Sequence, residues 1–124
     1  MGITGLGGIF FKCNDPIKLR EWYHEKLGLT SEQYGRAFLW DNVDGSSVWA
    51  PFSKDTTYFA PSAKEFMINF RVDDLTGYIE ELRGKQVEII SEISGEEYGK
   101  FAHILDLEGN KIELWEPNDS AMKD

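Results

Sequence analysis

The chain repeats itself, and this internal repeat is the feature that most constrains its fold. The segment "IFFKCND" at residues 9–15 returns as "INFRVDD" at residues 68–74, 59 positions later. The segment "DGSSVWAP" at residues 44–51 returns as "EGNKIELW" at residues 108–115, 64 positions later. Self-similarity at two corresponding places indicates that one supersecondary unit occurs twice. The chain is therefore interpreted as two copies of one unit.

The two copies define the expected domain organisation. A chain of 124 residues is long enough for one compact domain that needs neither disulfides nor a structural metal. The stretch "SKDTTYFAPSAKE" mixes polar residues, prolines and two aromatic residues, which is typical of a connector. We expect a single domain over residues 1–124, with repeats at about 6–52 and 66–117 joined by a connector at 53–65.

Each copy shows the same order of elements, namely a strand, a helix and then about three strands. In the first copy, "PIKLREWYHEKLGL" carries apolar residues at helical spacing, with Pro16 suited to the first turn and Gly28 to the C-terminal cap. In the second copy, "LTGYIEELRG" carries a similar apolar stripe and ends at Gly84. Two such units side by side predict an α+β fold with a cleft between their concave faces.

Short apolar runs bounded by turn residues give the remaining expected strands. The first strand of each copy is the repeated apolar segment itself. The polar segment "SGEEYG" at 94–99 predicts a loop. The other expected strands are 33–42 and 46–52 in the first copy, and 86–91, 100–106 and 110–116 in the second.

Charge and cysteine content limit the possible partners. The chain has 22 acidic and 13 basic residues, a net charge of −9. This balance argues against nucleic acid, because phosphate binding needs a basic surface, and it favours cationic ligands. The single cysteine, Cys13, cannot form an internal disulfide, so we expect a reducing, cytoplasmic location. We expect neither export nor a membrane, because no signal-peptide pattern or long apolar run is present.

The acidic helix caps, the opening "DPIKLREWYHEKLGL" and the closing "DLEGNKIELWEP" resemble the vicinal oxygen chelate superfamily. That group includes glyoxalase I, extradiol dioxygenases and bleomycin-resistance proteins, and the resemblance covers residues 6–117. It implies a glyoxalase-like α+β fold, in which two βαβββ modules form a curved mixed sheet around a central pocket. It also implies a homodimer and, commonly, one divalent metal ion. Activity varies widely among members, so the fold alone does not select a reaction.

The resemblance also implies where four metal ligands would lie, one on each inner strand. The corresponding positions are Gly8, Trp49, Met67 and Glu113. Only Glu113 could bind a divalent ion, which needs three or more oxygen or nitrogen ligands from the protein. We therefore expect no metal and no cofactor. Classical glyoxalase I activity relies on a metal, so we do not expect that activity either.

The closing segment places an imidazole and a carboxylate among apolar neighbours. If Asp106 and Asn110 close a three-residue loop with Gly109 in the left-handed conformation, His103 lies opposite Glu113. Opposed residues share a face of the sheet and lie roughly 5 Å apart at Cβ, close enough for a hydrogen bond. Glu113 and His103 are the candidate catalytic residues, as an acid/base pair. A structural pair that keeps the carboxylate from being buried alone remains the alternative.

Strand alternation extends the inner face of both copies. Aromatic and long polar side chains dominate this face, which indicates an aromatic pocket with a small polar corner. Simpler interpretations stay open, namely core filling for the tryptophans and solvent exposure for the two cations. The candidate ligand-binding residues are Phe10, Lys12, Trp49, Met67, Asn69, Arg71, Phe101 and Trp115.

Three functions fit these observations. The first is a glyoxalase-like or bleomycin-resistance-like protein whose aromatic pocket holds a small organic ligand without the family's metal. The second is a metal-independent lyase or isomerase that uses Glu113 and His103 for proton transfer. The third is a sequestering protein for a cationic drug, as the resemblance to bleomycin-resistance proteins implies. A ligand recovered unchanged after long incubation distinguishes binding from turnover.

Overall fold

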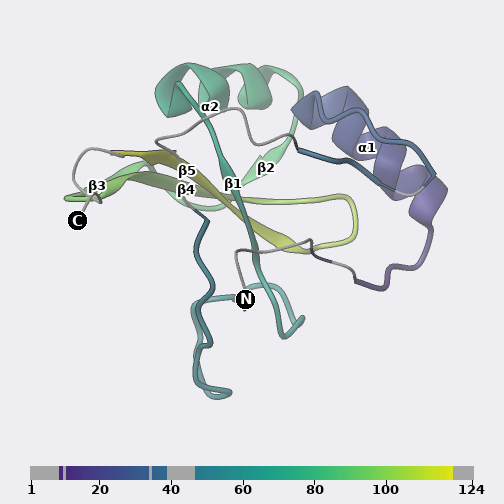
Figure 1. The fold of residues 1–124 in the computed structure, drawn as a ribbon. Coiled ribbons are helices and arrows are strands. Elements are labelled where there is room, and N and C mark those ends of the chain that lie inside the picture. Colours follow the sequence, from purple (N-terminus) through teal and green to yellow (C-terminus); the bar gives the residue numbers. More distant parts are fainter. Residues whose placement is uncertain (1–8, 10, 34, 39–46, 119–124) are drawn as a thin grey trace, which may run out of the picture.

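The computed structural model describes residues 9, 11–33, 35–38 and 47–118. Within these residues the chain forms two helices and a five-stranded mixed sheet, so the predicted α+β class is confirmed (Figure 1). Both helices lie on one side of the sheet, and residues 47–67, which lead into β1, lie on the other side. Neither described helix is long and apolar enough to cross a membrane.

Helix α1 spans Pro16–Leu27, and its ends follow the sequence signals. The Asp15 side chain accepts a hydrogen bond from the Lys18 backbone N–H, which satisfies one of the free donors of the first turn. Gly28 adopts the left-handed conformation with φ of 72°, which an L side chain rarely adopts. The predicted start and end of this helix are therefore confirmed.

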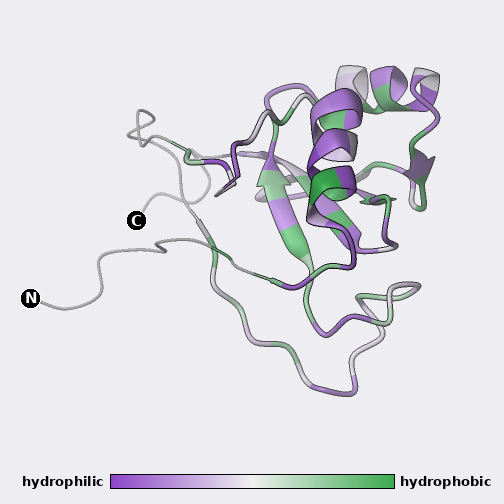
Figure 2. Cartoon of the chain, turned by 90° about the vertical axis from the view of Figure 1, so that its right-hand side faces the viewer, coloured by the Kyte–Doolittle hydropathy of each residue, from purple (hydrophilic) through white to green (hydrophobic). Residues whose placement is uncertain are grey.

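Helix α2 spans Leu75–Gly84 and begins in the same way. The Asp74 side chain accepts a hydrogen bond from the Gly77 backbone N–H. Hydrophobic and hydrophilic residues alternate along both helices, as expected for elements that bury one side (Figure 2). The acidic residue that ends each repeated apolar segment is thus a helix N-cap in both copies.

The sheet has the strand order β1-β5-β4-β2, and β3 pairs with β4. Strand β1 runs parallel to β5, whereas the pairs β4–β5, β2–β4 and β3–β4 are antiparallel. All five strands come from the second copy. Their bounds are Ile68–Arg71 for β1, Glu88–Ile89 for β2, Ser94–Glu96 for β3, Gly99–Leu105 for β4 and Lys111–Pro117 for β5.

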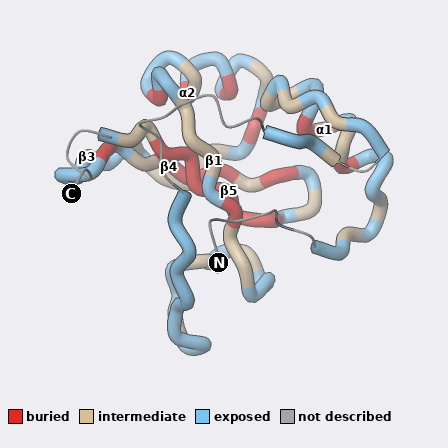
Figure 3. The backbone as a smooth tube through the Cα atoms, in the orientation of Figure 1, coloured by how far each residue is buried: buried red, intermediate tan, exposed pale blue. Residues whose placement is uncertain are grey.

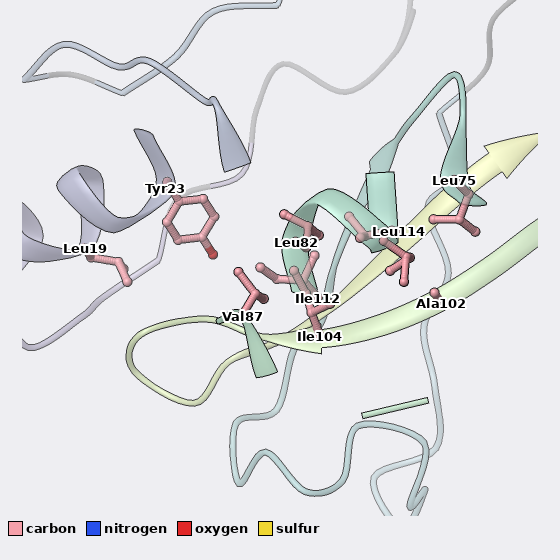
Figure 4. Close-up of a cluster of buried hydrophobic side chains, with 10 residues drawn as sticks. Leu19, Tyr23, Leu75, Leu82, Val87, Ala102, Ile104, Ile112 and Leu114 are labelled. Atoms are coloured by element: carbon pink, nitrogen blue, oxygen red, sulfur yellow. The ribbon is translucent and has the colours of Figure 1, made fainter. Parts of the chain in front are cut away.

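The hydrophobic core lies between the two helices and one face of the sheet (Figure 4). Leu75 and Leu82 of α2 are fully buried and contact the central strands, where Ile104, Ile112 and Leu114 are at most 1% exposed. Each such side chain contributes about 1.5–3 kcal/mol relative to leaving it exposed. The buried residues concentrate on β4, β5 and the inner sides of the helices (Figure 3). Because residues alternate along a strand, the opposite face of β4 and β5 is left for polar and aromatic side chains.

The turn between β4 and β5 is the predicted three-residue loop. The Asp106 N–H donates to the Asn110 carbonyl oxygen over 3.0 Å, and Gly109 has φ of 78°. One oxygen of the Asp106 side chain accepts from the backbone N–H groups of Glu108 and Asn110, and the other accepts from the Asn110 side chain. The turn register is therefore confirmed, and the Asp106 carboxylate holds it together from within.

The same turn binds the first helix to the sheet. The Tyr23 hydroxyl group donates to the Asp106 carboxylate over 2.8 Å. The Glu108 carboxylate accepts from the backbone N–H groups of Asn14 and Asp15, at 2.9 and 3.0 Å, just before α1 begins. A carboxylate is favourable at a helix N-terminus because the free N–H groups there carry partial positive charge. The first copy's helix is thus fixed by the second copy's turn.

The predicted strands of the first copy are wrong within the part of the chain that the structure describes. Residues 11–15 and 47–52 form no strand, and in 33–42 the described residues include only the bridge between Gly35 and Glu32. An apolar pattern becomes a strand only when a neighbouring strand supplies the hydrogen bonds, and no described neighbour does so here. Residues 39–46 lie outside the described residues.

Two details of the second copy also differ from prediction. The strand expected at 86–91 is only the two residues of β2. The segment "SGEEYG" was expected to be a loop, yet its first half is β3, which pairs with β4. All three residues of β3 are exposed, so its polar composition costs little at the sheet edge. The polar composition of this segment is therefore why the edge strand was not predicted.

Candidate functional site

The candidate site lies on the sheet face that the helices leave uncovered. The alternation that points Ala102, Ile104, Ile112 and Leu114 into the core points their neighbours the other way. The strand register then brings the candidate residues together in pairs. These pairs are Asn69 with Glu113, His103 with Glu113, Arg71 with Trp115, and Phe101 with Trp115.

Glu113 on β5 is the centre of a hydrogen-bond network. Its carboxylate accepts from His103 Nε2 over 2.8 Å and from the Tyr58 hydroxyl over 2.5 Å, both at Oε2. Its Oε1 accepts from Asn69 Nδ2 over 2.9 Å. The side chains of Glu113 and His103 are each only 11% exposed. A buried carboxylate is stable only when hydrogen bonds replace water, and these three donors do so.

Ser91 and Glu113 together favour the neutral form of His103 that carries its proton on Nε2. Its Oγ accepts from the His103 backbone N–H over 2.9 Å and lies 3.0 Å from His103 Nδ1. The hydroxyl hydrogen of Ser91 is thus available to Nδ1, which leaves the ring proton on Nε2. That proton points at Glu113. The tautomer suits hydrogen bonding to an ionised carboxylate.

The network favours the charged form of Glu113. Burial raises the pKa of the Glu113 carboxyl group, but hydrogen bonds from His103, Tyr58 and Asn69, with the charge interaction of His103, lower it by more. The resulting pKa lies below its ordinary value of 4.5. Burial and the hydrogen bond to Glu113 raise the pKa of Tyr58 above its ordinary value of 10. Glu113 is therefore an anion at neutral pH, and Tyr58 is a protonated donor.

Lys111 lies beside this network and is 8% exposed. Its ammonium group is 4.9 Å from the centroid of the Tyr58 ring and donates to the Tyr58 backbone carbonyl. Burial lowers the pKa of Lys111, and the charge of Glu113 partly offsets that effect. Lys111 thus contacts both the ring and the backbone of Tyr58.

A stack of aromatic residues continues the face toward the start of β4 and the end of β5. The rings of Phe101 and Trp115 are nearly parallel, at 3° and 6.1 Å between centroids. The Arg71 guanidinium lies 5.5 Å from the centroid of the Trp115 ring. The Trp115 Nε1–H donates to the Tyr98 carbonyl oxygen over 3.1 Å, which orients the indole. The face therefore combines the anionic Glu113, the cationic side chains of Lys111 and Arg71, and a flat aromatic surface.

The structure brings together six of the ten residues predicted from sequence. Met67 directly precedes β1 and is half-buried, whereas Lys12 and Trp49 are exposed, Trp49 by 78%. Within the described residues, the Glu113 carboxylate accepts from Tyr58, Asn69 and His103, and neither Lys12 nor Trp49 is among these donors. Phe10 lies outside the described residues. The six that share the face are Glu113, His103, Asn69, Arg71, Phe101 and Trp115.

Two residues of the site, Tyr58 and Ser91, were not predicted from the sequence. Tyr58 lies in a connector with no helical or strand periodicity, so no pattern pointed to it. Ser91 follows the short strand β2, whose register pairs Ile89 with Ile104. An antiparallel register of this kind places the next residues of the chain near His103, and the Ile90 N–H indeed donates to the His103 carbonyl. A predicted pairing of β2 with β4 would have found Ser91.

The donor set of the site does not suit the metal that the sequence resemblance implies. Among the described residues, no group of three or more His, Cys, Asp or Glu side chains could hold a metal ion. Glu113 and His103 are hydrogen-bonded to each other, and Gly8 lies outside the described residues. A divalent ion in a protein site generally takes three or more protein ligands, which these two side chains cannot supply.

A cavity of about 120 Å³ lies next to α1, and Arg71 is the one residue of the six on the face that also lines it. It is mainly apolar, and Phe70, Val72 and Leu114 line it together with Leu27 near the end of α1. The Tyr78 hydroxyl on its wall donates to the Leu27 carbonyl oxygen. It is therefore a gap between the first helix and the edge of the sheet, and Glu113 is not part of it.

Comparison with solved structures shows a shared fold at low sequence identity. TnmS3, an antibiotic binding protein from Streptomyces sp. CB03234, has a TM-score of 0.60 at 21% identity, over 95% of this chain and 99% of that one. A protein from the mobile metagenome of V. Pseudocholerae has a TM-score of 0.59 at 18% identity, over 94% and 96%. A hypothetical protein from S. aureus has a TM-score of 0.37 at 16% identity, and this chain spans 44% of its length.

The family comparison agrees with the fold. The search of curated proteins found no match. The family model of the Glyoxalase/Bleomycin resistance protein/Dioxygenase superfamily matches residues 5–114, which is most of the chain. The chain therefore belongs to the Glyoxalase/Bleomycin resistance protein/Dioxygenase superfamily.

Proposed function

We propose that this protein binds a small organic cation without covalent change, with Glu113 as the anionic anchor and the aromatic stack as the contact surface. The supporting observation is the state of Glu113, a carboxylate held in the charged form by three donors beside the aromatic stack. A shielded anion attracts a cation more strongly than one in water does. The net charge of −9 adds to this attraction.

The aromatic stack supports a flat or apolar body for the ligand. Phe101 is half-buried, so part of its ring is available for contact, and the Trp115 indole beneath it is held by the hydrogen bond to Tyr98. Rigid aromatic side chains bind ligands with little loss of conformational entropy. The fold of TnmS3, which is named as an antibiotic binding protein, suits the same kind of role.

Acid/base catalysis by Glu113 and His103 is the second candidate, as in a metal-independent lyase or isomerase. The hydrogen bond of 2.8 Å between them and the Ser91 contact at Nδ1 favour it. The pKa of Glu113 is against it, because a general base works best with a pKa near the operating pH and that of Glu113 is lowered. Binding is therefore the better supported function.

Assembly, metal content and compartment complete the proposal. We expect a homodimer, because β1 and β2 form the edges of the sheet among the described residues and a partner chain would cover such an edge. Static light scattering at tens of micromolar tests this expectation, and a monomer mass would contradict it. We expect ligand binding without a metal ion in a reducing cytoplasm. Elemental analysis that finds about one metal per chain would overturn the expectation of metal-free binding.

Isothermal titration calorimetry tests the proposed function with three naphthalene compounds. These are 2-(1-naphthyl)ethylammonium, the neutral 1-ethylnaphthalene and the anionic 1-naphthylacetate. We expect the cation to bind at one per chain, the neutral compound to bind weakly and the anion not to bind. Chromatography of the cation after long incubation should return it unchanged.

Glu113→Gln and Glu21→Gln form the matched pair of variants. Each removes one negative charge, but Glu21 is exposed on α1 and Glu113 is buried in the site. We expect Glu113→Gln to weaken binding of the cation by about tenfold or more, which is about 1.4 kcal/mol, and Glu21→Gln to leave it within about twofold. Equal affinity for the cation and the anion in the wild-type protein would refute the proposal.

A further inference from the structure

Tyr58 reaches the site from outside the sheet. It lies in the connector between α1 and β1. Residues 47–67, which include Tyr58, lie on the side of the sheet away from the helices (Figure 1). Its hydroxyl group nevertheless donates to Glu113 Oε2 over 2.5 Å and lies 3.3 Å from His103 Nε2. Two sheet residues and one connector residue therefore share the same small polar centre.

The Tyr58 ring covers this centre. It meets the His103 ring edge to face at 5.5 Å between centroids, and Lys111 lies 4.9 Å from its centroid. Phe52, which directly precedes the connector, stacks on the Tyr58 ring at 5.8 Å between centroids. Tyr58 is 41% exposed, while the Glu113 side chain beneath it is 11% exposed. Tyr58 thus lies between the carboxylate and solvent.

The three donors to Glu113 differ in how firmly they are held. Asn69 lies on β1 and His103 on β4, and both strands pair directly with β5. Tyr58 lies in a segment that forms neither a helix nor a strand. Such segments open locally at a lower free-energy cost than paired strands do. Tyr58 is exposed enough for a molecule from solvent to contact it. Of the three donors, Tyr58 is the one whose backbone is not held in the sheet.

We propose that a ligand must displace the Tyr58 hydroxyl group and replace its hydrogen bond to Glu113 Oε2, so that Glu113 accepts only ligands that carry a donor of their own. This inference rests on the proposed function. A cation with an N–H donor, such as a primary or secondary ammonium group, restores the lost hydrogen bond. A quaternary ammonium ion carries the same charge but leaves a buried acceptor one donor short, which is costly. The preferred ligand is therefore an aromatic amine in its protonated form.

Two probes with the same ring and charge test the inference by calorimetry. They are 2-(1-naphthyl)ethylammonium and its N,N,N-trimethyl analogue, which differ in the N–H donors. We expect the wild-type protein to bind the primary ammonium probe about tenfold or more tightly than the trimethyl probe. The nuclear Overhauser contact between the Tyr58 and His103 rings should disappear when the primary probe binds.

Tyr58→Phe is the decisive variant, with Tyr78→Phe as its control. The first removes the hydroxyl group at Glu113 and keeps the ring against Lys111 and His103. The second removes a hydroxyl group that donates to Leu27 on the helix side of the sheet. Because displacement no longer breaks a hydrogen bond, Tyr58→Phe should raise the affinity of both probes by about fivefold or more. Tyr78→Phe should leave both affinities within about twofold.

The outcomes separate the inference from the proposed function. If both probes bind the wild-type protein and Tyr58→Phe weakens or does not change their affinity, Tyr58 is part of the binding wall and the inference is wrong, while the proposed function stands. Equal affinity of the two probes also overturns the inference alone. If neither probe binds the wild-type protein or Tyr58→Phe, the proposed function and the inference fall together.

Discussion

Two segments of the chain share a sequence pattern and have opposite structures. In the repeat, Val48 corresponds to Ile112 and Trp49 corresponds to Glu113. Ile112 is fully buried in β5, whereas Val48 is 65% exposed and belongs to no strand. Glu113 is 8% exposed, whereas Trp49 is 78% exposed. The local pattern is therefore not what buries a residue.

The difference comes from the partners that each segment has. Strand β5 pairs with β1 on one side and with β4 on the other, and α2 packs on its apolar face. The described residues at 47–52 pair with no strand. Hydrogen-bonded neighbours and a covering helix are what turn an apolar pattern into a buried strand. Only the second copy supplies both within the described residues.

The two helices, unlike the two strand-like segments, have the same structure in both copies. Both begin at an acidic cap, and both pack on the sheet that the second copy forms. Helix α1 achieves this through Tyr23 and Leu19 in the core and through the carboxylates of Asp106 and Glu108. A helix satisfies its own backbone and needs only one surface to pack on, whereas a strand needs neighbours.

The largest expected effect separates the two corresponding residues Ile112 and Val48. Ile112→Ala should lower the free energy of unfolding by about 2–5 kcal/mol, because it opens a cavity in the core. Val48→Ala should change it by less than about 0.5 kcal/mol. Urea unfolding of both variants measures the contrast. A loss above about 1.5 kcal/mol for Val48→Ala would show that the segment is buried in solution and would remove the contrast.

The next effect concerns the contact between the first helix and the second copy's turn. Tyr23→Phe removes the hydrogen bond to the Asp106 carboxylate and should lower the free energy of unfolding by about 1.5–3 kcal/mol. Tyr78→Phe removes a hydrogen bond to a neutral carbonyl and should cost about 0.5–1.5 kcal/mol. Hydrogen exchange of the α1 amides should accelerate more in Tyr23→Phe. Equal stability of the two variants would mean that the turn does not hold the helix.

Sequence alone predicted the parts of the fold that local chemistry determines. The caps at Asp15 and Asp74 and the left-handed glycines Gly28 and Gly109 follow from side-chain hydrogen bonds and backbone sterics. The pair His103 and Glu113 follows from the turn length, so the centre of the candidate site was predictable. These features depend on residues that are close together in sequence.

The features that sequence did not predict depend on distant partners. Tyr58 reaches Glu113 across 55 positions of the chain, and its connector has no periodicity. The contact of Ser91 with His103 can be predicted only when the register of β2 against β4 is known. The strands expected near Val48 required neighbours that a pattern of apolar residues does not specify. In physical terms, the missing information is tertiary pairing.

A smaller effect is expected at Ser91, which has no counterpart in the described part of the first copy. Ser91→Ala removes the acceptor of the His103 N–H and the partner of Nδ1, and should lower the free energy of unfolding by about 0.5–1.5 kcal/mol. The ¹⁵N shifts of His103 should then show a mixture of the two ring tautomers. Ser94→Ala, at an exposed position of β3, should change neither quantity. An unchanged tautomer in Ser91→Ala would assign the orientation of His103 to Glu113 alone.

The smallest expected effect is the pH dependence that Glu113 contributes and that its counterpart Trp49 cannot contribute. The pKa of Glu113 is lowered in the folded state, so the unfolded chain binds its proton first as the pH falls. Its contribution to stability is therefore present above the unfolded value of about 4.5 and is lost as the pH falls through the folded value. Urea unfolding of wild type and Glu113→Gln from pH 7 to pH 3 isolates this contribution, because the other carboxylates are common to both proteins. The stability advantage of wild type over Glu113→Gln should shrink as the pH falls below about 4.5. A difference that stays constant, or that grows toward low pH, would show that Glu113 is not held as an anion and that the second copy's face lacks the charge on which binding depends.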